Sequence, residues 1–401
     1  SGEHSGDVIN TSSTTHYDTD ADGDTLIVSE VRTGNTEDAG TAGTIGSALT
    51  GTYGQLTLRA NGSYTYVANQ TAADALDDGD IVYDYFNYTV DDQTGAANDE
   101  DHGVITITVI GVNDVPTAQD DVGVIAEGST LTVANSANAT LTGDSYDATG
   151  ENSGDLIDTS SASHTDSDAD ASSSLSITHI KLSGGSNSTV ASSSSYNSNG
   201  TSITGTYGTL TIGADGSYTY AATTDATDAL DSGESATDTF VYTLSDGTRI
   251  TTANLTITVL GSNDAPVAQN DVGVIAEDST LSVSDGADAN ETGGSYNATG
   301  EHSGDVIDSS NTSTRDTDVD VETLTVTAIR LGSSEGSGTA GTVGSALTGT
   351  YGQLTLNSNG SYSYVANQTA ADALDAGDSV TDSFNYTVSD GTATDTAVIT
   401  R

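Results

Sequence analysis

Acidic side chains at alternating positions are the residues of this chain best suited to do chemistry. Three short runs carry an aspartate at every second position. Carboxylates this close repel one another, and at an effective dielectric constant near 20 a pair about 4 Å apart costs about 4 kcal/mol. A hard divalent cation reverses the sign, and Ca²⁺ accepts oxygen ligands in a looser geometry than Mg²⁺. We call these runs the acidic turns and predict Ca²⁺ ligands at Asp18, Asp20, Asp22 and Asp24, at Asp166, Asp168 and Asp170, and at Asp316, Asp318 and Asp320.

The first acidic turn also looks like the opening of an EF-hand loop, but that match fails. The position that would need a bidentate Glu is Ser29, and the glycine at Gly23 becomes Ala171 and Val321 in the later turns. A strand is also expected where the EF-hand has a helix. A calcium loop of a β-domain fits better, and a solvated acidic turn is the alternative.

A second group of acidic residues surrounds the only two prolines, Pro116 and Pro266. Each proline fixes φ where one repeat meets the next and leaves a short joint with little slack. A proline turn with incidental acids is the alternative to a second metal site. We predict ligands at Asn113, Asp114, Asp120, Asp121 and Glu127 in the first joint, and at Asn263, Asp264, Asp271 and Glu277 in the second.

The acidic positions recur because the whole chain repeats. Ser5-Gly6-Asp7 returns as Ser153-Gly154-Asp155 and as Ser303-Gly304-Asp305, a period of about 150 residues that corresponds to a domain. We predict three tandem domains, at residues 1–115, 116–265 and 266–401. The first is expected to lack its first strand, and the third its closing strand and joint. An edge left open in this way either accepts a strand from another chain or belongs to a longer polypeptide.

Apolar residues alternate with polar ones along most of each repeat, as in 104–109, which is typical of β-strands. Asn61-Gly62, Asp215-Gly216 and Asn359-Gly360 predict the same hairpin in all three repeats, with a type I′ turn. Phe86, Phe240 and Phe384 fall at one repeat position within such a strand and are expected in the core. The fold class follows: all-β, three tandem Ig-like or cadherin-like Greek-key β-sandwich domains in an elongated array.

Composition excludes several classes of partner. The 59 Asp and Glu face seven Lys and Arg, and the formal net charge of -52 repels nucleic acid and anionic membrane surfaces. No apolar stretch is long enough to insert into a membrane. Cysteine is absent, so no disulfide holds the domains together. No histidine recurs in all three repeats, which argues against an enzyme.

The succession of motifs resembles the VCBS repeat of large bacterial surface adhesins of the RTX type. The motifs are G-T-Y-G-x-L-T, N/D-G-S-Y, A-L-D-x-G, D-x-F-x-Y-T and N-D-x-P, and they span essentially the whole chain. The resemblance implies a cadherin-like or Ig-like sandwich, secretion through a type I exporter and a place on the outer cell surface. It also implies that Asn113, Asp114, Asn263 and Asp264 bind calcium between domains. Gly111 and Gly261 stand where cadherins carry a further ligand Asp.

Two functions fit these observations. In the first, calcium ions stiffen the joints, and the domains act as a rigid spacer in cell adhesion or biofilm formation. In the second, like chains assemble into an extracellular fibre or surface layer by strand exchange. Both require contact between neighbouring domains of the chain, and the second adds contact between chains.

Overall fold

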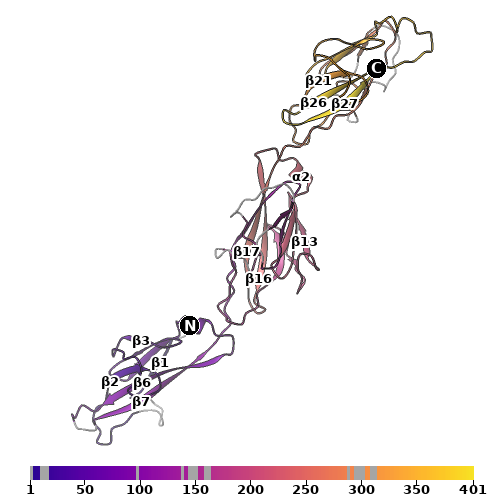
Figure 1. Cartoon of the computed structure of the whole chain (residues 1–401). Coiled ribbons are helices and arrows are strands. Elements are labelled where there is room, and N and C mark those ends of the chain that lie inside the picture. The colour runs from indigo at the N-terminus through magenta and orange to yellow at the C-terminus, as the bar shows by residue number, and fades with distance from the viewer. Residues whose placement is uncertain are drawn as a thin grey trace.

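The computed structural model describes residues 3–9, 18–95, 99–136, 140–142, 152–157, 164–286, 290–292, 303–307 and 314–401. Nearly all regular structure in these residues is β-strand, and it forms three sandwiches that follow one another end to end (Figure 1). The predicted fold class is confirmed. No helix in the described part of the chain is long and apolar enough to cross a membrane.

Domain 1 pairs a four-stranded sheet, in the order β1-β5-β4-β3, with a three-stranded sheet, in the order β2-β6-β7. Strand β7 has a strand partner on one side only among the described residues. The elements are β1 (Glu3–Asp7), β2 (Ile27–Thr33), β3 (Ala48–Thr50), β4 (Gln55–Leu58), β5 (Ser63–Val67), the one-turn helix α1 (Thr71–Asp74), β6 (Ile81–Asp91) and β7 (Glu100–Ile110).

Domain 2 has two five-stranded sheets, in the orders β10-β9-β15-β14-β13 and β12-β11-β16-β17-β8. Strand β8 pairs in parallel with β17 over its whole length and so runs along the domain. The elements are β8 (Asp121–Ala126), β9 (Thr130–Val133), β10 (Thr140–Thr142), β11 (Ser176–Leu182), β12 (Ser188–Thr189), β13 (Thr201–Thr204), β14 (Thr209–Ile212), β15 (Tyr218–Ala221), the helix α2 (Asp225–Asp228), β16 (Ser235–Ser245) and β17 (Ile250–Leu260).

Domain 3 repeats this plan, with sheets in the orders β20-β19-β25-β24-β23 and β18-β27-β26-β21-β22. Here the first strand pairs with the last over Asp271 and Val272 only. The strands are β18 (Asp271–Val272), β19 (Thr280–Val283), β20 (Asn290–Thr292), β21 (Thr325–Leu331), β22 (Thr339–Ala340), β23 (Leu347–Thr348), β24 (Gln353–Leu356), β25 (Tyr362–Val365), β26 (Ser383–Ser389) and β27 (Thr394–Thr400).

The three phenylalanines lie in the core, as predicted, and are completely buried. Each packs edge-on against a tyrosine of the facing sheet; in domain 2 the ring centroids of Phe240 and Tyr220 are 6.1 Å apart. The alternation of the strands explains this placement, since every second side chain of β16 faces the opposite sheet.

A buried carboxylate ties the two sheets of each domain together. In domain 2, Asp238 of β16 accepts hydrogen bonds from the backbone N–H groups of Thr206 and Tyr207 and from the hydroxyl of Tyr220. Asp84 and Asp382 make the corresponding bonds in domains 1 and 3. The G-T-Y-G loop is therefore held by one aspartate from the facing sheet.

The hairpins form where they were predicted, but the turn type is different. Gly62 has a φ of 85°, while Asn61 does not adopt positive φ, as a type I′ turn would require. The N–H of Gly62 instead bonds the carbonyl of Arg59. The Asn61 side chain accepts bonds from both Ser63 N and Ser63 Oγ, which holds Asn61 itself outside the left-handed region.

Candidate metal centre

The acidic turns divide their aspartates between two environments. In domain 3, Asp316 faces the interior and is 3% exposed, with Tyr386 donating to its carboxylate. Asp318 accepts the N–H of Asp320. Asp320 in turn reaches out of the domain and accepts the N–H of Asp264 in the linker, at 2.7 Å. The acidic turn and the joint are separate clusters in the sequence, but they are in contact in the structure.

The second joint brings together carboxylates from both domains. Asp231 comes from domain 2, directly after α2, and Asp320 and Glu322 come from the acidic turn of domain 3. One oxygen from each of the three lies within 4.8 Å of the others. Asn263 of the linker donates to Asp390 of domain 3 at 3.1 Å. Oxygen ligands are thus drawn from both domains to one place between them.

The electrostatics of this joint are those of a cation site. Burial raises the pKa of Glu322 to about 7, and the neighbouring Asp318 adds to the shift. The pKa of Asp264 is raised by burial and then by the nearby acids, Asp320 foremost. Several carboxylate oxygens here are buried without a hydrogen-bond partner, namely Asp318 Oδ2, Asp320 Oδ1 and Glu322 Oε2. Buried carboxylate oxygens that have no hydrogen-bond donor are suitable ligands for a hard cation such as Ca²⁺.

The first joint has the same plan with one substitution. Asp114 donates its N–H to Asp170 at 2.8 Å, and Asn113 donates its side-chain amide to Asp246 at 2.9 Å. Asp77 of domain 1 occupies the place of Asp231, but its partner in domain 2 is Ser172, which donates both N–H and hydroxyl to it. A neutral donor therefore stands where the second joint has the Glu322 carboxylate.

The acidic turn of domain 1 forms no such joint with described residues. Asp18 accepts the Tyr88 hydroxyl at 2.8 Å, as the first aspartate does in the other domains. Asp20 accepts the N–H groups of Asp22 and Asp24, and these bonds, that of Asp24 foremost, hold its pKa below the usual value. Here the run is an exposed turn closed on its own backbone.

Several residues predicted as joint ligands lie elsewhere. Asp121 and Asp271 are buried inside their domains, at 1% and 0% exposure. Asp120 accepts bonds from the backbone and side chain of Asn254 in β17. Glu127 was placed in the first joint because it follows Pro116, but its carboxylate accepts the hydroxyl of Ser262 beside the second joint. Strand β8 runs beside Leu255–Leu260, the half of β17 that leads to the second joint, and so carries the chain away from the first joint before Glu127 is reached.

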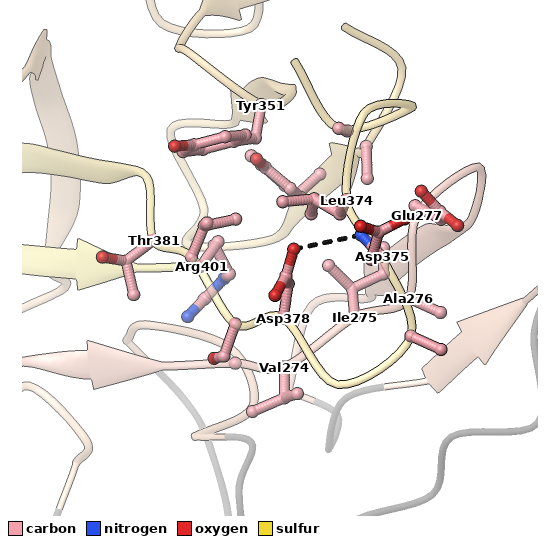
Figure 2. A pocket seen from close by; sticks show the side chains of 17 residues that line it. Val274, Ile275, Ala276, Glu277, Tyr351, Leu374, Asp375, Asp378, Thr381 and Arg401 are labelled. Carbon is pink, nitrogen blue, oxygen red and sulfur yellow. Dashed lines mark hydrogen bonds between the residues drawn. The ribbon is translucent and has the colours of Figure 1, made fainter. Parts of the chain in front are cut away.

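Glu277 follows the same rule in domain 3. It lines a pocket with an accessible volume of about 450 Å³ that also includes Leu374, Asp375 and Arg401. Figure 2 shows Glu277 beside Asp375, on the side of the pocket away from Arg401. Asp375 falls at the repeat position of Asp231, so Glu277 belongs to the end of domain 3 and not to the second joint.

Five carboxylates of the joints were not predicted as ligands: Asp77, Asp231, Asp246, Glu322 and Asp390. The signal was present, because Asp77 and Asp231 are the aspartates of the A-L-D-x-G motif. Asp246 and Asp390 share a D-G-T turn. Neither motif carries aspartates at alternating positions in all three repeats, and so neither indicated a metal by itself.

The structure thus defines an array of β-sandwiches with acidic joints. Residues 263–401 match the model of the bacterial cadherin-like domain, and the match begins at the Asn-Asp of the second joint. The third repeat is therefore cadherin-like. No curated protein matches the chain.

Similar solved structures have low scores. The extracellular cadherin domains 1–4 of protocadherin gamma B7 are 13% identical, with 90% of this chain and 68% of that chain covered and a TM-score of 0.34. Drosophila N-cadherin EC1-4 is 11% identical, with 98% and 70% covered and a TM-score of 0.27. An endo-fucoidan hydrolase of glycoside hydrolase family 107 is 13% identical, with 100% and 41% covered and a TM-score of 0.21. The chain spans less than half the length of that hydrolase, and we carry no property of these proteins over to it.

Proposed function

We propose that this chain is a calcium-stiffened extracellular repeat region of a bacterial surface protein, and that it acts as a rigid spacer in cell adhesion or biofilm formation. The observation that carries the proposal is the meeting of Asp231, Asp320 and Glu322 between two domains. An ion held by ligands from both sides of a joint couples the orientation of one domain to the next.

Calcium suits this joint better than other metals. The donors are carboxylate oxygens, with the side chain of Asn263 nearby, and none is a sulfur or an imidazole among the described ligands. Extracellular calcium modules bind at about 10⁻⁴–10⁻³ M, so an external medium at millimolar calcium fills them. A site of this affinity would be largely empty at cytosolic calcium concentrations.

Stiffening follows from repulsion and its relief. Without an ion, the carboxylates of the joint repel one another, and bending of the linker is limited by Pro266 and by the hydrogen bonds of Asn263 and Asp264 to domain 3. With an ion, the same carboxylates converge. The end-to-end order of the domains (Figure 1) then gives a long spacer instead of a flexible string.

Small-angle scattering of the whole chain tests this proposal. We expect a rod-like particle in millimolar calcium and a broader distribution of bent shapes in excess chelator. Glu277→Gln, at the end of domain 3 and outside both joints, serves as the control and should behave as the unchanged chain. A maximum dimension that is the same in calcium and in chelator would contradict calcium stiffening.

A second function, assembly of like chains by strand exchange, is favoured by one feature of domain 1. Strand β7 carries exposed apolar residues at Ile110 and, just beyond it, Val112, and both line a groove with Ala73 and Ile107. Such an edge can accept an extended segment. Sedimentation of the chain over a wide concentration range distinguishes the two functions, because only the second requires growth with concentration.

A further inference from the structure

Domains 2 and 3 each contain a second set of carboxylates, inside the sandwich, that the joints do not use. We call it the interior cluster. None of its members is more than 4% exposed. One member of each cluster, Asp155 or Asp305, comes from the repeated Ser-Gly-Asp motif, which has no part in the joints. The members are Asp121, Asp155 and Asp166 in domain 2, and Asp271, Asp305 and Asp316 in domain 3.

One phenol lies between two carboxylates of each interior cluster. In domain 2, Tyr242 Oη is 3.1 Å from Asp121 Oδ2, 3.2 Å from Asp166 Oδ2 and 2.8 Å from the carbonyl oxygen of Gln119. Tyr386 repeats this arrangement in domain 3 with Asp271 and Asp316. A phenol has a single proton to donate, so it cannot satisfy three acceptors at once. Asp166 also accepts the N–H of Gln119, whereas Asp121 keeps one oxygen without a hydrogen-bond partner.

Two buried polar atoms of domain 2 have no hydrogen-bond partner. Asp121 Oδ1 accepts no hydrogen bond, although the residue is 1% exposed. The hydroxyl of Tyr218 has no partner either, and that residue is completely buried. Burial raises the pKa of Tyr218, and the charges of Asp121 and Asp155 raise it further. The same orphan oxygen recurs in domain 3 at Asp271 Oδ1.

Domain 3 supplies part of the missing positive charge itself. Arg401 is 5% exposed, and its guanidinium lies 4.4 Å from the centre of the Tyr362 ring. Its charge lowers the pKa of Asp271, against the larger effect of burial. Arg401 bonds the backbone of Asp382 just as Ile257 pairs with Asp238 in domain 2. At this position domain 2 therefore has an isoleucine and no charge.

We propose that the interior cluster of domain 2 binds a calcium ion inside the sandwich, separate from the ion at the second joint. Asp121, Asp155 and Asp166 supply carboxylate oxygens, and the Gln119 carbonyl oxygen is within reach. These carboxylates are spaced more widely than the three of the second joint, so water completes the shell. In domain 3 the guanidinium of Arg401 competes with the ion and weakens its binding.

Counting bound calcium in the whole chain by equilibrium dialysis tests this inference. Asp121→Asn keeps the size of the side chain and should bind one calcium fewer than the unchanged chain. Arg401→Ile gives domain 3 the residue of domain 2 and should bind calcium at that cluster more tightly, which keeps the test decisive if Asp121→Asn folds poorly. Equal calcium counts and affinities in all three proteins would overturn the proposal.

A luminescence measurement separates this site from the joints. Tb³⁺ replaces Ca²⁺ and is sensitised by tyrosine at short range, so a Tb³⁺ ion beside Tyr242 and Tyr218 should emit on tyrosine excitation. Asp121→Asn should abolish that emission from domain 2 and leave the calcium-dependent shape of the chain unchanged. Asp231→Asn should do the reverse. Emission that is lost only with Asp231→Asn would place the ion at the joint and refute an interior site.

Discussion

Neutralising Asp231 is expected to weaken calcium binding at the second joint without disturbing either domain. Asp231 and Asp320 approach to 4.8 Å or less across the joint. Their repulsion at that separation is about 0.9 kcal/mol at the dielectric constant of water and about 3.5 kcal/mol at an effective value near 20. A bound ion holds both carboxylates together against this repulsion, so we take its size as the scale of the ion–carboxylate attraction that the substitution removes. These energies correspond to about 5-fold and 400-fold in the dissociation constant, respectively.

Partial exposure selects the lower part of this range. Asp231 and Asp320 are both intermediate in burial, so water and salt screen the pair. We expect Asp231→Asn to raise the calcium concentration at the midpoint of joint closure by about 5- to 30-fold. Higher ionic strength should reduce the difference between the two proteins, because it screens the same pair.

Energy transfer between domains 2 and 3 measures this midpoint. The chain has no cysteine, so Ser192→Cys and Ser334→Cys provide unique exposed positions for a donor and an acceptor dye. Calcium is titrated into the labelled chain with and without Asp231→Asn. Asp77→Asn is the matched control, since it makes the same change at the first joint and should leave the midpoint of the second joint unmoved.

An unchanged midpoint with Asp231→Asn would show that Asp231 does not hold the ion of the second joint. An equal shift with Asp77→Asn would show that the effect comes from the overall charge of the chain.

Three further predictions follow from individual contacts. Glu322→Ser copies the first joint, where Ser172 donates directly to Asp77; it should let the second joint close at lower calcium or without it, as seen by the same energy transfer. Asp238→Ala removes the acceptor of two backbone N–H groups and of the buried Tyr220 hydroxyl and should cost about 3–5 kcal/mol of the stability of domain 2 in urea unfolding, equally in calcium and chelator. In chelator, burial first and the nearby acids next raise the pKa of Asp121 from 3.8 to about 8, so the unfolded chain loses this proton at lower pH than the folded one. The stability of domain 2 should therefore fall as pH rises from about 4 to about 8 and level off above that; Asp121→Asn should flatten this slope, and an unchanged slope in the variant would assign the pH dependence to other groups.

The β-sandwich itself could be predicted from the sequence because strands leave a local signal. Apolar residues at every second position predict which face of a strand is buried, wherever one face packs on the core. Strands β4 and β14 are examples, since every second residue of each is buried. The repeats then multiply that signal by three. The turn type of the hairpins escaped prediction, since Asn-Gly is compatible with more than one turn and the Asn61 side chain decided between them.

The candidate metal centre was predicted in part. Runs of aspartate identified Asp168, Asp170, Asp318 and Asp320, and the N-D-x-P motif identified the linkers. Asp77 and Asp231 were missed because their loop does not carry aspartates at alternating positions in all three repeats. Only the approach of a neighbouring domain gives such a residue a partner. A long-range contact of this kind leaves no periodic trace in the sequence.

By itself, then, the sequence determined the tandem β-sandwiches, the core phenylalanines and the places where carboxylates are abundant. The tertiary structure alone decided which carboxylates meet. Asp121 and Glu127 are six positions apart in the sequence, yet the strand between them advances about 3.3 Å per residue and leads from Asp121 in the interior of domain 2 to Glu127 beside Ser262, next to the second joint. Asp231 and Asp320 are far apart in the sequence and lie within 4.8 Å, because each stands at the end of its own domain where the linker turns. In an extended fold, the place of a charged residue along its domain determines which other charges lie near it. Its distance from them along the sequence does not.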